Sequence, residues 1–134
     1  MADAVTSQTL ADGDRVAVMK FTNLSDGNGE STVLKVDVSA LNTNSSTGAT
    51  CTRVSIRRVW ALTSGMSVHV LWKADANVLA MGVPSDGSFY WDLRSIGPIS
   101  NNAGTNVDGD IYFTTIGHTA NDTYVIILEM SKTY

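Results

Sequence analysis

The sequence predicts an all-β protein, a single-domain antiparallel β-sandwich that is jelly-roll-like. About eight short segments alternate apolar and polar residues with the period of two of a strand. Clusters of Gly, Pro, Asn, Asp and Ser separate these segments, and no segment of useful length holds the 3.6-residue period of an amphipathic helix. Many short strands divided by turns are typical of a two-sheet sandwich, jelly roll or related barrel.

The N-terminal residues 1–14 are small and polar, and Val5 and Leu10 are their only sizeable aliphatic side chains. Two interpretations are open: a free tail, or an arm that docks these two residues on a neighbouring subunit. We expect residues 1–14 to be an N-terminal arm, ordered only against another subunit, because two aliphatic residues cannot form a core. Residues 15–134 would then form the sandwich domain.

The first strand of the predicted sandwich domain is Arg15–Leu24, which has apolar residues in both alternating phases, as in a strand covered on each side. The turn-forming sequence SDGNGE follows at residues 25–30, and a half-buried strand follows at Leu34–Val38. These two neighbouring strands are candidates for a hairpin.

The central stretch Thr52–Lys73 is interpreted as two long strands joined by Thr63-Ser64-Gly65. A three-residue loop ending in Gly fits a hairpin whose last loop residue is left-handed. This loop length pairs Trp60 with Val68 and Arg58 with Val70. The resulting register gathers the apolar residues on one face: Val54, Ile56, Trp60, Leu62, Met66, Val68, Val70 and Trp72.

In that register Arg58 falls in the apolar phase, where an unpaired guanidinium would cost several kcal/mol. Three arrangements would relieve the cost: a β-bulge at Arg57-Arg58, a carboxylate partner at the sheet edge, or a face that meets another subunit. We favour a subunit contact with a carboxylate partner, because the planar guanidinium suits interfacial pairs.

The rest of the chain continues the strand pattern after an exposed polar loop at Ala40–Ala49. Short strands at Asn77–Val83 and Ser88–Leu93 flank the turn sequence PSDG, with Pro in its favoured early position. A long irregular connection at Arg94–Asp108 follows. The last two predicted strands are Asp110–Ile116 and Thr123–Lys132.

Composition excludes several classes of function. The 134 residues carry a net charge of −4 and only 16% charged residues, so nucleic-acid binding, which needs a basic patch, is not expected. The sequence has no apolar run of membrane-spanning length and no visible signal peptide, so we expect a protein that is made in the cytoplasm and binds no membrane. A single cysteine, Cys51, rules out an internal disulfide.

The sequence predicts no catalytic, cofactor-binding or metal site. Gly27-Asn28-Gly29 begins like a phosphate-binding loop, but a strand follows where a helix is needed. Residues 26–37 have part of the spacing of a calcium loop but lack its essential Gly and final Glu. His69, His118 and Cys51 lie in no ligand or nucleophile motif. The carboxylates Asp92, Asp108 and Asp110 flank aromatic strands but are more simply explained as strand and turn residues.

Four stretches carry a resemblance: MADAVTSQTLADGDRVAVMKFTNLSDGNGESTVLKVDVSAL, VWALTSGMSVHVLWKADANVLAMGVP, GTNVDGDIYFTTIGHT and TYVIILEM. Together they cover most of the chain. The sequence resembles small virion structural proteins of tailed phages, of the marine or cyanobacterial type. The resemblance implies a non-enzymatic capsid decoration or cement protein, found on the capsid surface and made in the host cytoplasm. A tail or neck component is the alternative.

The partners implied are the major capsid protein or another virion protein, and we expect a homo-oligomer, possibly a trimer. Candidate interface residues are Val5, Leu10, Arg57 and Arg58. A rival function is that of a carbohydrate-binding β-sandwich module. An exposed pair among the four large aromatic residues Trp60, Trp72, Tyr90 and Trp91 would support it. A third, weaker rival is a glycan hydrolase, which would need a carboxylate pair in a cleft.

Overall fold

A computed structural model describes residues 4–104 and 109–134. The described residues form nine strands and a short 3₁₀ helix, η1. Their bounds are β1 Ala4–Asp12, β2 Val16–Leu24, β3 Val33–Val36, η1 Val38–Ala40, β4 Arg53–Ser64, β5 Ser67–Trp72, β6 Val78–Val83, β7 Gly87–Asp92, β8 Ile111–Ile116 and β9 Thr123–Thr133. The predicted strands are therefore present within a few residues at each end, and Val38 starts η1 instead of ending a strand.

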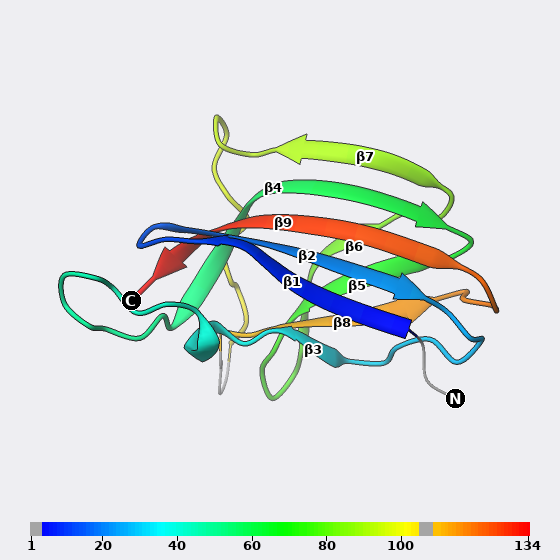
Figure 1. The fold of residues 1–134 in the computed structure, drawn as a ribbon, viewed down its shortest axis with the longest axis horizontal. Helices are drawn as coiled ribbons and strands as arrows, with labels where there is room; N and C mark the ends of the chain where they lie inside the picture. Colours follow the sequence, from blue (N-terminus) through cyan, green and yellow to red (C-terminus); the bar gives the residue numbers. More distant parts are fainter. Residues whose placement is uncertain (1–3, 105–108) are drawn as a thin grey trace.

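The described strands form two antiparallel sheets packed as a β-sandwich (Figure 1). We call the five-stranded sheet, of order β1-β2-β9-β4-β7, sheet A and the four-stranded one, of order β3-β8-β5-β6, sheet B. Strand pairs β2·β9, β3·β8, β4·β7 and β5·β6 are nested in the sequence, as if one long hairpin were rolled up. This is the jelly-roll arrangement, so the predicted fold class is confirmed, and β1 is added at one edge.

The core lies between the two sheets and is centred on aromatic residues from both of them. Phe113 of β8 packs edge-on against Phe21 of β2, with ring centroids 5.1 Å apart, and against Tyr124 of β9 at 5.9 Å. Each such aromatic pair contributes about 0.5–1.5 kcal/mol beyond the burial of apolar area. Trp72 of β5 is fully buried in the same core.

A buried polar network closes one end of this core. Tyr124 donates its hydroxyl proton to Glu30 Oε1 at 2.6 Å, and the Asn23 amide donates to the same oxygen at 3.0 Å. Lys35 forms a buried ion pair with the second oxygen of Glu30. Glu30 therefore faces into the sandwich, because a buried carboxylate needs such partners.

The two hairpins predicted from the sequence are wrong. β2 lies in sheet A and β3 in sheet B, and β4 and β5 are likewise divided between the sheets. Gly65 does take the left-handed conformation, with φ of 84°, but its loop carries the chain across the sandwich. Strand β4 pairs with β7 and β9 instead. The sequence could not show this, because a short loop containing Gly can join two strands of different sheets as well as two strands of a hairpin.

A β-bulge in β4 changes which side chains face the core. The register with β9 shifts between Ile56 and Arg58, and the extra residue reverses the alternation beyond it. Ile56 and Val59 are therefore both buried, while Trp60 is only partly buried and Leu62 is exposed. The prediction that Trp60 and Leu62 share the core face with Val54 and Ile56 is wrong for this reason.

The predicted arm is ordered against its own chain. Residues Ala4–Asp12 form β1, which pairs antiparallel with β2, so the expectation that the arm is ordered only against another subunit is corrected. The backbone of β2 offers a free edge, and β1 satisfies its hydrogen-bonding groups. All residues from Ala4 to Ala11 remain exposed, as expected for a segment without a core of its own.

The turn between β1 and β2 is fixed by a buried lysine. Lys132 Nζ of β9 donates to Asp12 Oδ1 at 2.6 Å, to the Gly13 carbonyl at 2.8 Å and to the Asn42 carbonyl at 2.7 Å. Its side chain has no exposed surface. Asp12 therefore adds a side-chain contact with a buried lysine to the backbone pairing of β1 with β2.

Candidate functional site

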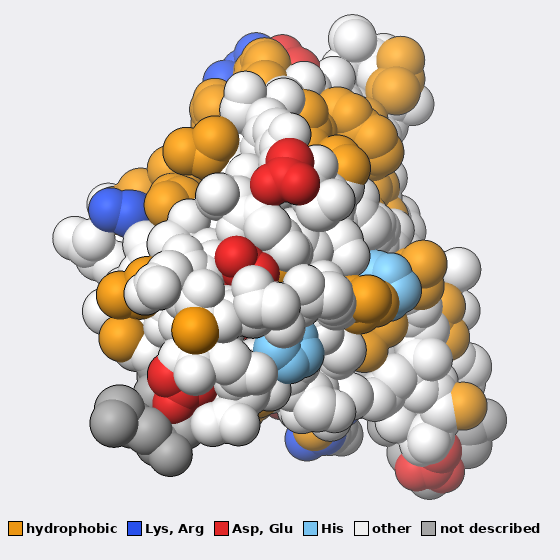
Figure 2. Space-filling view, turned by 90° about the vertical axis from the view of Figure 1, so that its right-hand side faces the viewer, with side chains coloured by type: hydrophobic (Ala, Val, Ile, Leu, Met, Phe, Trp, Pro, Cys, Tyr) orange, Lys and Arg blue, Asp and Glu red, His pale blue; other side chains and the backbone are white. Residues whose placement is uncertain are grey.

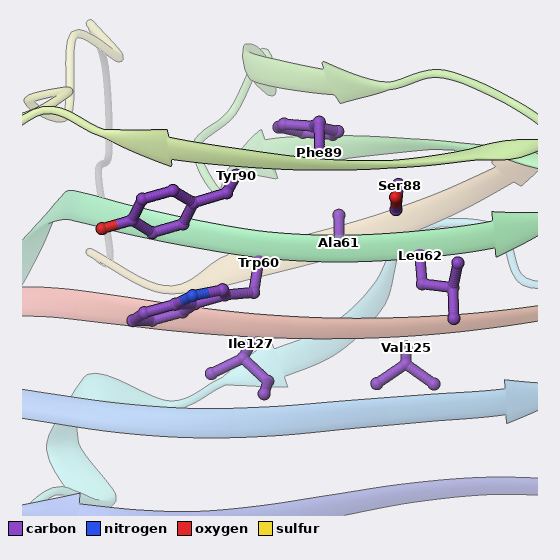
Figure 3. A pocket seen from close by; sticks show the side chains of 8 residues that line it. All are labelled: Trp60, Ala61, Leu62, Ser88, Phe89, Tyr90, Val125 and Ile127. Atoms are coloured by element: carbon purple, nitrogen blue, oxygen red, sulfur yellow. The ribbon is translucent and has the colours of Figure 1, made fainter.

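The outer face of sheet A carries a stacked aromatic pair. Trp60 of β4 and Tyr90 of β7 are directly opposite in the strand register, and their ring centroids lie 5.2 Å apart at an interplanar angle of 30°. Tyr90 is 48% exposed. Figure 3 shows both rings extending in the same direction along their strands. The bulge in β4 creates this pair, because it turns Trp60 away from the core.

An apolar groove of about 560 Å³ runs beside the aromatic pair. Its lining comes from three neighbouring strands, β4, β7 and β9 (Figure 3): Trp60, Ala61, Leu62, Ser88, Phe89, Tyr90, Val125 and Ile127. The outer face of an antiparallel sheet is usually polar where it meets water. Here Leu62 is 55% exposed, and an apolar hollow on an outer sheet face is a candidate contact surface. We call it the sheet A groove.

Charged side chains flank the groove in two bidentate pairs. Arg58 donates from Nε and Nη2 to Glu129 at 2.7 and 2.6 Å, and its guanidinium lies over the Trp60 ring at 5.0 Å. Arg94 donates from Nε and Nη2 to Asp92 at 2.9 and 2.7 Å. Hydrogen bonding to Arg58 lowers the pKa of Glu129, and hydrogen bonding to Arg94 lowers the pKa of Asp92. Both carboxylates are therefore charged near neutral pH.

Tyr90 links the two pairs. Hydrogen bonding to Glu129 is the main cause that raises the pKa of Arg58, and hydrogen bonding to Tyr90 is the second. Tyr90 also contributes to the lowered pKa of Asp92, after Arg94. The polar end of Tyr90 therefore lies near Arg58 and Asp92, which are opposite each other on β4 and β7.

A shallower hollow of about 400 Å³ adjoins the groove beyond β7. It is lined by Tyr90, Trp91, Asp92, Leu93 and Ile96, and Ile96 is 80% exposed. Trp91 follows Tyr90 on β7 and therefore lies on the opposite face of this strand. The apolar surface thus continues around the β7 edge of sheet A.

The four predicted interface residues do not come together. Val5 and Leu10, 43% and 48% exposed, lie on β1 at one edge of sheet A, whereas Arg57 and Arg58 lie on β4, with β2 and β9 between. The favoured arrangement for Arg58 is corrected in one respect: its carboxylate partner is Glu129 of the same chain, and it occurs together with the bulge.

The residues with reactive side chains are dispersed over the fold. Cys51 is buried and donates to the Arg53 carbonyl, and burial raises the pKa of its thiol. His69 lies on β5 opposite Gly82 and Thr114. His118 contacts the hydroxyl of Thr115. Figure 2 shows histidine side chains at the surface that lies on the right in Figure 1, surrounded mostly by uncharged atoms. Within residues 4–104 and 109–134, no three His, Cys, Asp or Glu side chains gather as metal ligands do.

Sequence reasoning identified Trp60 and Tyr90 but not their neighbours. Leu62 was expected in the core, and Glu129 was not recognised as the partner of Arg58. Trp72, named with the same aromatic group, is fully buried. The consecutive Arg57 and Arg58 in an otherwise alternating strand were the signal for the bulge.

Comparisons with known proteins give only weak structural similarities. No family model and no curated protein matches the chain. A cupin superfamily protein from Desulfitobacterium hafniense is similar over 100% of this chain and 82% of its own, with 12% identity and a TM-score of 0.36. A mutant family 29 carbohydrate-binding module is similar over 96% of this chain and 92% of its own, with 14% identity and a TM-score of 0.43. At these TM-scores neither similarity bears on function.

Proposed function

We propose that this protein is a non-enzymatic structural component of a tailed-phage virion, and that it decorates and stabilises the assembled capsid. The observation that carries the proposal is strand β1, which is ordered but leaves every residue from Ala4 to Ala11 exposed. Such a strand contributes little to its own core. Its exposed surface is available to another protein, as the resemblance to virion proteins implies.

The free edge of β1 provides a means of attachment. β1 is the outermost strand of sheet A, so the described residues pair it on one side only. Soluble proteins usually protect such an edge with charges, Pro or bulges. Residues 4–11 contain no charge and no Pro, and the register shift between Thr9 and Ala11 affects only the end nearest the turn. Ala4–Thr9 can therefore accept a strand from a capsid subunit.

Val5 and Leu10 add apolar contact to this backbone pairing. Both are aliphatic and nearly half exposed on β1. Their apolar surface is removed from water only when a partner covers it, and this burial would favour binding. A protein that binds assembled shell, and not free shell subunits, stabilises the shell by its binding free energy, repeated over many copies. The major capsid protein is the proposed partner, and trimers at local threefold positions are the natural unit by analogy.

Counting copies in purified particles tests the proposal. Mass spectrometry with cryo-electron microscopy would give hundreds of copies per particle for a head protein. A small multiple of three or six would indicate the tail or neck alternative. Absence from the particle would contradict a virion role altogether.

A further inference from the structure

The sheet A groove lies on the part of the molecule that the proposed attachment leaves free. β1 and β7 are the opposite edges of sheet A, and the groove is lined from β4, β7 and β9. A subunit attached through β1 therefore exposes the groove to solution. The groove is complete within the isolated chain, whatever the protein is attached to.

The groove combines an apolar floor with a fixed aromatic wall. Leu62, Val125 and Ile127 supply aliphatic surface, and the Trp60–Tyr90 stack stands at one end (Figure 3). The guanidinium of Arg58 over the indole helps to hold Trp60 in one orientation. A wall that is ordered before binding loses little conformational entropy when a ligand arrives. The groove volume lies in the range of small-molecule sites.

The polar groups beside the aromatic wall are charged, and four of them form two ion pairs. Arg58 is paired with Glu129, and Arg94 with Asp92. Arg57, the neighbouring bulge residue, also acts on Glu129 through its charge. A guanidinium has five N–H donors and a carboxylate about four acceptor positions. Arg58 and the exposed Asp92–Arg94 pair therefore keep donors and acceptors for a ligand, whereas Glu129 is only 7% exposed. With Arg57 included, three guanidiniums face two carboxylates, and this single surplus charge gives only a modest attraction for a strongly charged ligand.

We propose that the sheet A groove binds a neutral glycan, with one sugar ring against the exposed aromatic surface of Trp60 and Tyr90 and its hydroxyls on Arg58 and on the exposed Asp92–Arg94 pair. A pyranose ring has an apolar C–H face and a rim of hydroxyls that both donate and accept hydrogen bonds. These are the two properties that the groove offers side by side. An acidic polysaccharide or nucleic acid would need an uncompensated basic surface.

Titration calorimetry of the full chain with cellohexaose, mannohexaose and maltohexaose tests the proposal, and a hexamer of alginate serves as the charged probe. We expect at least one neutral hexasaccharide to bind and to shift the indole N–H resonance of Trp60 in NMR spectra. Trp60→Ala and Tyr90→Ala should each weaken binding by about tenfold or more. Trp60→Phe, which keeps a flat ring, should lose less.

Leu79→Ala is the control, because it removes an exposed apolar side chain from β6 of sheet B, which contributes no residue to the groove lining. It should leave the affinity unchanged, and the melting temperature of every variant shows whether it is folded. The proposal is overturned if no neutral hexasaccharide binds at millimolar concentration, or if folded Trp60→Ala and Tyr90→Ala bind as tightly as the wild type. Preference for alginate, lost in high salt, would overturn the neutral assignment. A groove that binds capsid protein and none of these sugars would be a protein interface.

Discussion

Arg58 and Glu129 are direct partners across β4 and β9, and their side chains form a bidentate salt bridge with distances of 2.7 and 2.6 Å. The β-bulge places Arg58 on the outer face of sheet A, beside Trp60. Glu129 is largely buried there. The pair therefore connects the stability of sheet A to the orientation of the aromatic wall.

Replacing Arg58 by Met should lower the melting temperature of the isolated protein. The substitution leaves the Glu129 carboxylate largely buried without its guanidinium, and an unpaired buried carboxylate is strongly destabilising. Thermal unfolding followed by circular dichroism gives the measurement. Arg57→Met, at the neighbouring bulge residue, is the control and should have the smaller effect. Adding Glu129→Leu to Arg58→Met should restore part of the loss; equal melting temperatures for all variants would show that the pair does not matter for stability.

The same pair should make stability depend on pH in the acidic range. The pKa of Glu129 is lowered from its ordinary 4.5 in the folded protein. Its contribution to stability is therefore present above pH 4.5 and lost as the pH falls through the folded pKa. We expect the difference in melting temperature between wild type and Glu129→Gln to be largest near pH 7 and to shrink at lower pH. A difference that grows on acidification would reverse the sign of this linkage.

Two N-terminal deletions that differ by one residue should behave differently. Removing residues 1–11 takes away exposed side chains and the backbone pairing of β1 with β2, but no buried side chain. The melting temperature should therefore fall by only a few degrees, while binding to phage heads weakens. Removing residues 1–12 also removes Asp12 and leaves the buried Lys132 without its carboxylate. That deletion should cost about 2 kcal/mol more.

Urea unfolding of both deletion variants, together with sedimentation on purified heads, provides the comparison. Equal stabilities of the two deletion variants would show that the Asp12–Lys132 ion pair does not contribute to stability. Undiminished head binding by the 1–11 deletion would remove β1 from the proposed interface.

Substituting Ala for Cys51, His69 or His118, one at a time, should leave both head binding and glycan binding intact. None of the three lies in the sheet A groove or on β1. Small stability losses are expected, the largest for Cys51 because its side chain is buried. Loss of binding in a variant with a normal melting temperature would assign that residue a functional role.

The sequence by itself determined where the strands and turns after residue 14 lie, whereas strand β1 was not predicted from it. Alternation of apolar and polar residues is a local property, so β2, β5 and β9 could be placed from the residues alone, as could the left-handed Gly65. The exposed character of the N-terminal segment followed in the same way from its lack of large apolar residues. The buried Cys51 was also as expected.

Only the tertiary structure decided which strands pair and which face of β4 is buried. A strand edge can pair with any other edge, so the choice of β7 and β9 over β5 depends on how the two sheets close around one core. The bulge at Arg57 is favoured because it lets Arg58 reach Glu129, which is distant in the sequence. The outward position of Trp60 therefore depends on the bulge and on the Arg58–Glu129 contact, and the sequence of β4 alone does not reveal that contact.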